Sequence, residues 1–261
     1  MQQRLPIVPT LASAYREWWR LLSPLRGLLL NAVIISIAIA ATAEFVPQRL
    51  WDSAIIGEAA GLMQDAIWAL LFTPILIAIH RFVIRDEVTR AYAFPVGEPP
   101  FRHFFLWLFA LKVLTGLPFD FLGLLQSFDL SLAATSLGLA VALIVAVAVW
   151  LRLTILLPAV AVRAPGATAA HAMADTKDQA LRLLAIFFLA LVPWIAADVA
   201  AVILLGRGVE VTGSPAMMVL LVIGGVVETI TLSLIAVIAS LAFIALARTV
   251  NHAGALSPGA A

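Results

Sequence analysis

Six separate stretches of the chain are each long and apolar enough to cross a lipid bilayer as a helix, and this pattern restricts the possible folds most. A transmembrane helix needs about 20 apolar residues to cross a hydrocarbon core of about 30 Å. Of the 261 residues, 63% are hydrophobic and 12% are charged, whereas a soluble domain carries about 25% charged residues. The sequence therefore predicts a single all-α domain over residues 1–261, an integral membrane bundle of six transmembrane helices. The predicted spans occupy residues 26–46, 64–84, 103–124, 131–152, 182–205 and 225–247.

The ends of two spans are ambiguous, because their apolar runs continue beyond the length that one crossing needs. Residues 153–162 extend the fourth span and residues 216–227 extend the sixth, either as tilted helix or as turns at the interface. Residues 23–24 and 214–215 are both Ser-Pro, which places a capping hydroxyl before a proline at the first helical position. We expect helices to start at both points.

Basic residues are distributed unevenly between the two sides that six spans define. The side with both termini carries 13 of the 16 lysines and arginines, and the opposite side carries Arg49 and Arg207. Because loops rich in Lys and Arg stay in the cytoplasm, this bias predicts that both termini are cytoplasmic. As an alternative, residues 27–43 are the core of a signal peptide that ends in the Ala-Thr-Ala of residues 41–43. The long preceding segment with its two tryptophans favours a span.

A short amphipathic segment precedes the first span. In residues 10–22, the side chains of Leu11, Tyr15, Trp18 and Leu22 share one helical face. Aromatic residues beside arginines on such a helix are typical of the membrane interface. This N-terminal helix is therefore either an anchor for the first span or a docking site for a partner or an anionic lipid.

Three loops have local signals of their own. Residues 51–62 align apolar side chains on one face and predict a second interfacial helix on the outer side. Residues 85–101 contain three prolines and predict an irregular segment. Residues 163–181 start with a Pro-Gly turn and are then predicted to be helical from about Thr168.

A single lysine lies in the middle of the third predicted span. Arg102 marks the inner end of that span, and Lys112 lies ten residues further along the helix. This spacing places Lys112 about 15 Å from the inner end, near the midplane of the membrane. Asp198 lies about 24 Å from Arg182 in the fifth span and is the first candidate partner. Glu228 is expected near the outer interface and is the second candidate if the last helix is tilted.

An unpaired charge at this depth costs at least about 2.5–3.5 kcal/mol, so Lys112 needs water, a partner or deprotonation. Pro118 offers another partner, because it cannot donate a hydrogen bond to the carbonyl of Leu114. Two interpretations stay open: a buried structural tie between helices, or a charge that lines a polar cavity for a substrate or a proton. The candidate intramembrane polar site consists of Lys112, Asp198 and Glu228.

Sequence motifs that carry catalytic chemistry are missing. The chain contains no P-loop, HExxH, GxSxG or GxGxxG motif, no cysteine, and no carboxylate pair placed for acid–base catalysis. The four histidines are scattered and are each expected at the cytoplasmic interface. Basic residues follow the membrane topology, so nucleic acid is not an expected partner. We therefore expect no catalytic activity, no cofactor and no metal site.

The stretch from residue 150 to residue 184 carries a family resemblance. It contains an arginine followed by an apolar run with proline, residues 152–158, and then an amphipathic helix with a threonine–basic step, Thr176-Lys177. In these features the chain resembles bacterial polytopic membrane proteins related to the membrane domain of some glycerophosphodiester phosphodiesterases. The N-terminal amphipathic helix followed by a span is similar too.

The chain also departs from that group. The tryptophan and glycine that are usual around the threonine–basic step are absent, and Met173, Ala174 and Asp178 stand in that region. The phosphodiesterase activity of the group belongs to a separate soluble domain, to which nothing here corresponds. The resemblance therefore implies a multi-pass protein of the bacterial inner membrane without known chemistry.

Two functions of different classes follow from these observations. The first is a non-catalytic membrane protein that organises the membrane or forms the membrane part of a complex. It predicts a dry, packed environment for Lys112, and its partners would be the lipid bilayer and a membrane protein or a second copy of the chain. The alternative is a small transporter or permease subunit, with Lys112 and Asp198 facing a polar cavity between spans three, five and six. A membrane-embedded enzyme is the third possibility.

Overall fold

The described part of the chain is all-α, as the sequence predicts. The computed structural model describes residues 5–45, 54–126, 132–205, 215–247 and 250, and among these it contains helices and no strand. The helices are α1 Ile7–Leu22, α2 Arg26–Phe45, α3 Ala54–Arg85, α4 Pro99–Gln126, α5 Leu132–Leu153, α6 Leu156–Ala161, α7 Ala169–Asp175, α8 Ala180–Leu205 and α9 Pro215–Leu246.

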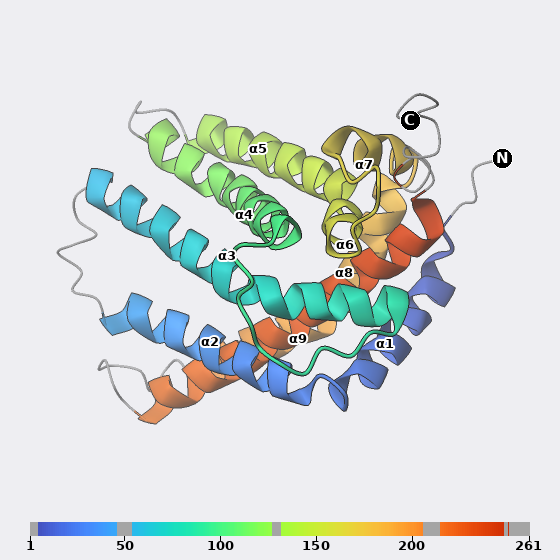
Figure 1. Cartoon of the computed structure of the whole chain (residues 1–261). Coiled ribbons are helices and arrows are strands. Elements are labelled where there is room, and N and C mark those ends of the chain that lie inside the picture. Colours follow the sequence, from blue (N-terminus) through green and yellow to red (C-terminus); the bar gives the residue numbers. More distant parts are fainter. Residues whose placement is uncertain (1–4, 46–53, 127–131, 206–214, 248–249, 251–261) are drawn as a thin grey trace.

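The last long helix lies at the centre of the bundle. Helix α9 packs against α1, α2, α3 and α8, and α4 pairs with α5 on the other side of α3 (Figure 1). The buried core follows these contacts and contains mainly Leu, Ile, Ala and Phe. Apolar side chains that stay outside this core are numerous on α5 and α8. This distribution is compatible with a protein embedded in a membrane, where lipid covers the outer helix faces.

Four stretches of the described residues are long and apolar enough to cross a membrane. They are Ala59–Arg85, Ala133–Ala161, Ala180–Leu205 and Pro215–Leu246. A fifth is formed if α1 and Arg26–Thr42, which are bent by 97°, count as one span. Helix α4 is not in this set. The structure thus supports four or five crossings, and the count of six stays a prediction.

Several local predictions can be compared with the helix ends. Helix α9 starts at Pro215 and continues through residues 216–227, so the apolar extension of the sixth span is helix. At the other Ser-Pro pair the prediction is wrong, because residues 23–25 form a turn and α2 starts at Arg26. Residues 154–155 form a turn and α6 follows, so the apolar run beyond the fourth span continues as a short helix within the candidate span Ala133–Ala161.

The loop predictions have mixed outcomes. No helix forms in residues 86–98, and α7 starts directly after Thr168, whose hydroxyl oxygen accepts a hydrogen bond from the amide of His171, as an N-cap does. The separate interfacial helix predicted for residues 51–62 is not formed in its described part, because residues 54–62 are the first turns of the continuous helix α3.

Helix α1 is docked onto the bundle by its aromatic face. The indole Nε1 of Trp18 donates a hydrogen bond to Ser233 of α9 at 2.9 Å, and the hydroxyl of Tyr15 donates to the carbonyl of Ala190 of α8 at 2.8 Å. Trp18 is only 5% exposed, whereas Trp19 is 66% exposed. The amphipathic pattern therefore reflects packing against α8 and α9, and Trp19 is left on the outer face.

Residues that are far apart in the sequence meet at one end of the bundle. The amide of Leu5 donates to the side chain of Gln179, and the amide of Val250 donates to the carboxylate of Asp175. The start of α1 and the end of α9 lie at this same end (Figure 1). These contacts place Leu5, Val250 and the loop of residues 163–181 at one end of the bundle.

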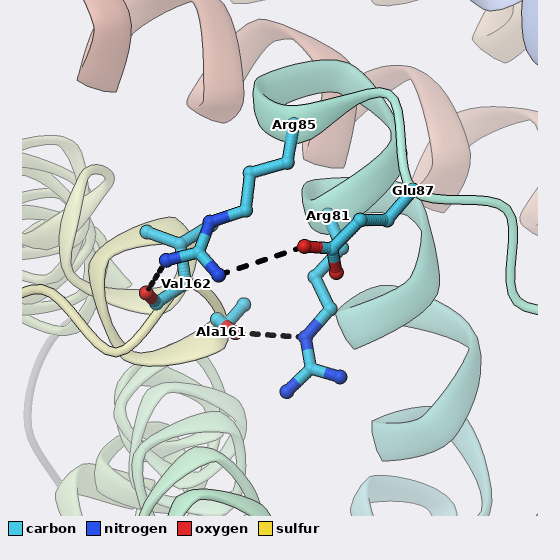
Figure 2. Close-up of polar contacts among 5 residues, drawn as sticks. All are labelled: Arg81, Arg85, Glu87, Ala161 and Val162. Atoms are coloured by element: carbon cyan, nitrogen blue, oxygen red, sulfur yellow. Dashed lines mark hydrogen bonds and ion pairs between the residues drawn. The ribbon is translucent and has the colours of Figure 1, made fainter.

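Two arginines of α3 fix the short helix α6 at this end. Figure 2 shows Arg81 and Arg85 extending from α3 toward the last turn of α6. Arg81 donates to the carbonyl of Ala161 at 3.0 Å, Arg85 donates to the carbonyl of Val162, and Arg85 also pairs with Glu87. Carbonyls at the end of a helix lack intrahelical partners and carry partial negative charge, so guanidinium groups stabilise them. These hydrogen bonds hold the end of α6 against α3.

Candidate functional site

A cavity of about 310 Å³ lies between the helices that pack around Lys112. Its walls come from α3, α4, α9 and the junction of α5 with α6, and not from α8. Most of the lining is aliphatic. The polar and aromatic lining residues are Trp68, His80, Lys112, Thr115, Trp150, Thr154 and Glu228.

Lys112 has a carboxylate partner in this region. Its Nζ lies 3.8 Å from Oδ1 of Asp65 on α3, and it also lies 5.1 Å from the ring centroid of Trp68. The side chains of Lys112 and Asp65 are 40% and 29% exposed, so the pair is neither fully buried nor free. An ammonium above an indole face is attracted by the ring quadrupole. These two contacts hold the ammonium of Lys112 beside α3 and leave its side chain partly exposed.

Glu228 is linked to the same cluster through Trp68. The indole Nε1 of Trp68 donates a hydrogen bond to Oε1 of Glu228 at 2.9 Å. Trp68 therefore lies between the ammonium of Lys112 on its face and the carboxylate of Glu228 at its edge. Among the described residues, Glu228 has no ion-pair partner.

His80 lines the cavity on the side of α6. It is 1% exposed and its Nδ1 is 2.8 Å from the hydroxyl of Ser240 on α9. The hydroxyl of Ser240 donates in turn to the carbonyl of Ala236, so it accepts from the histidine ring. The side chain of His80 is buried against α4 and α9, and its position at the cytoplasmic interface stays a prediction. A neutral imidazole with its Nδ1–H toward Ser240 fits these contacts.

The structure brings together two of the three predicted site residues. Lys112 and Glu228 line the cavity, and Asp198 does not. Asp198 lies in the C-terminal half of α8, where no side chain from residue 191 to residue 205 is buried. Asp65 takes the position next to Lys112 that the sequence assigned first to Asp198.

The depth estimates explain both differences. Helix α3 has 32 residues, about 48 Å, so it is longer than the hydrocarbon core and Asp65 lies well inside it. Asp65 is 11 residues from the start of α3, and Lys112 is 14 residues from the end of α4. Their distances from these two helix ends therefore differ by only about 4–5 Å. Glu228 is 13 residues inside α9 because that helix starts at Pro215, ten residues earlier than the predicted span. It therefore lies near the middle of its helix rather than at an interface.

The composition of the cavity lining indicates a binding site. The described residues contain no group of three or more His, Asp or Glu side chains placed to hold a metal ion. The cavity combines aliphatic walls, two indole rings and a few polar groups. Such a lining is typical of a site for a small organic molecule.

Two residues that carry the family resemblance, Arg152 and Thr176, form hydrogen bonds that join helices. The hydroxyl of Thr176 lies within hydrogen-bond distance of the carbonyls of both Arg152 and Ala172, at 2.8 and 2.7 Å. The guanidinium of Arg152 donates to the carbonyl of Met173 at 2.9 Å. The arginine and the threonine thus join α5 to α7, which explains their spacing by packing.

Comparisons with family models, with curated proteins and with solved structures find no match to this chain. The resemblance to the phosphodiesterase membrane-domain group therefore stays a prediction.

Proposed function

We propose that this chain is a small transporter or permease subunit that binds its solute in the cavity beside Lys112. The observation that carries the proposal is the position of the Asp65–Lys112 pair, which adjoins a cavity halfway along long apolar helices. Charges inside a membrane protein are costly, and they commonly mark substrate or ion pathways. The half-exposed ammonium of Lys112 supports this function over a dry structural tie.

The proposed topology has six crossings in a bacterial inner membrane. The crossings are α2, α3, α4, α5 with α6, α8 and α9, and α1 is an interfacial helix docked on the bundle. We place both termini in the cytoplasm. The basic residues near the end shared by Leu5 and Val250, which include Arg81, Arg85 and Arg163, support this orientation.

Thiol labelling of single-cysteine variants tests the proposal, because the chain has no cysteine of its own. Thr115→Cys places a thiol on the cavity wall three residues from Lys112, and we expect a small water-soluble thiol reagent to label it in native membranes. Ala242→Cys is the matched control, because Ala242 is 0% exposed and outside the cavity lining. It should react only after denaturation.

Silence at Thr115→Cys in native membranes, with labelling after denaturation, would mean that water does not reach the cavity. The transporter function would then be wrong, and Lys112 would be a structural tie between α3 and α4. Labelling of Ala242→Cys to the same extent would show that the reagent reaches buried positions throughout the bundle. Labelling of Thr115→Cys would then not indicate a water-accessible cavity, and the proposal would lose its support.

A second candidate function is the membrane part of a larger complex. It is supported by the outer half of α8, where Asp198 lies among exposed apolar side chains such as Ile195 and Val202. A carboxylate on a lipid-facing surface is costly, and a partner helix would cover it. If a second copy is this partner, Asp198→Cys should form a disulfide-linked dimer in mildly oxidised membranes, whereas Ala242→Cys should stay monomeric. Monomer alone for both variants would contradict a second copy at this surface.

A further inference from the structure

We propose that the cavity selects a monovalent organic cation with an aromatic or compact apolar body, and that Glu228 is its counter-ion. This inference rests on the proposed function, because it names the class of solute that the same cavity would carry. It starts from the charges that face the cavity and from the chemistry of its walls.

The charges around the cavity do not balance. Among the side chains that the structure describes, the cluster contains one cation, Lys112, and two carboxylates, Asp65 and Glu228. The ammonium of Lys112 is 3.8 Å from Asp65, so its charge is already compensated. His80 is 1% exposed, and burial favours the uncharged imidazole, so His80 adds no charge. The ionised cluster therefore has one excess negative charge.

This excess lies on the carboxylate of Glu228. Oε1 accepts the indole hydrogen bond from Trp68, which satisfies one oxygen without neutralising the group. In surroundings of low dielectric constant, an uncompensated carboxylate attracts a positive charge more strongly than it would in water. A solute with one positive charge would restore neutrality, whereas an anion would face both Glu228 and an ammonium that is already paired.

The walls of the cavity suit the body of such a cation. Two indole rings, Trp68 and Trp150, line it together with leucines of α4 and α9. Indole is the side chain with the strongest cation–π attraction, and Lys112 already uses this property of the Trp68 ring at 5.1 Å. A volume of about 310 Å³ is at the small end of ligand cavities, which favours a compact molecule.

The test uses two probes with the same ring and opposite charge, phenyltrimethylammonium and benzenesulfonate. Their binding to the purified full-length protein in lipid nanodiscs is measured by equilibrium dialysis or calorimetry. We expect saturable binding of phenyltrimethylammonium and none of benzenesulfonate over the same concentration range. Glu228→Gln should weaken binding of the cation by about tenfold or more, because it removes the charge. The amide oxygen of glutamine still accepts from Trp68, which keeps the fold intact.

Asp198→Asn is the matched control, because it removes a carboxylate from a membrane-spanning helix but not from the cavity. It should leave binding of the cation unchanged. Benzenesulfonate binding as tightly as phenyltrimethylammonium would overturn the inference, and so would an equal loss in Asp198→Asn and Glu228→Gln. No binding of the cation, combined with labelling of Thr115→Cys, would overturn the charge preference and leave the proposed function standing. No binding without labelling would contradict both.

Discussion

Replacing Trp18 with alanine should lower the free energy of unfolding by about 3–5 kcal/mol, the range for removing a buried tryptophan. The indole is 5% exposed and packs beside Trp194 of α8, with 6.0 Å between ring centroids. Its Nε1 donates to Ser233 across 215 positions of sequence, so the variant loses a tertiary hydrogen bond together with the packing. The midpoint of thermal or SDS-induced unfolding of the purified protein measures the effect.

Trp19→Ala is the matched control for this experiment. Trp19 is the next residue and has the same side chain, but it is 66% exposed and touches Trp18 only ring edge to ring face. The cost of its removal should be about 1 kcal/mol or less. If the two variants lose similar stability, or if Trp19→Ala loses more, α1 does not dock on α8 and α9 by the face described above.

Trp18→Phe separates the hydrogen bond from the packing. Phenylalanine fills most of the same space but leaves Ser233 without its indole donor, so an intermediate loss is expected. Adding Ser233→Ala to Trp18→Phe should cost less than Ser233→Ala costs in the wild-type background, because the shared bond can be lost only once. Additive losses would mean that the hydrogen bond contributes little.

Gly225→Val should be the second severe substitution, because α2 and α9 cross closely at this residue. A Cβ at Gly225 would lie 2.6 Å from Cγ1 of Ile37 and 3.3 Å from both the amide nitrogen of Ile37 and the carbonyl oxygen of Val33. Two of these three contacts are with backbone, which cannot rotate away. Overpacking of this kind costs about 1–3 kcal/mol, and a branched side chain should reach the upper end. Small residues at helix crossings of membrane proteins serve the same close approach.

Gly224 provides the control on the same helix. A Cβ there meets nothing within 4 Å, so Gly224→Val should change stability by no more than about 1 kcal/mol. Gly225→Ala combined with Ile37→Ala should lose less stability than the sum of the two single variants, since the second change removes the clashing Cγ1. Equal effects of valine at residues 224 and 225 would show that α2 and α9 do not cross here.

Much of the secondary structure follows from the sequence because it depends on local properties. Apolar runs long enough to span a bilayer predicted most of α3, α5, α8 and α9, since hydropathy and helix length are read along one segment at a time. The helix predicted from about Thr168 and the helix start at Pro215 were likewise local signals, and both are confirmed. The Ser-Pro signal failed at residues 23–24, where the chain has to bend by 97° between α1 and α2 and a turn forms instead.

Hydropathy along the chain is enough to predict a bundle of long apolar helices and to identify Lys112 as a polar outlier within one of them. Helix packing is needed to pair Asp65 with Lys112, to join Trp68 and Glu228 to them around a cavity, and to place Asp198 elsewhere. Apolar helices have similar compositions, so their order around the bundle and their relative heights depend on how side chains interlock across helix pairs. The ion pair between Asp65 and Lys112, at 3.8 Å, depends on the order of the helices and on their relative heights. The sequence of a single helix contains neither quantity.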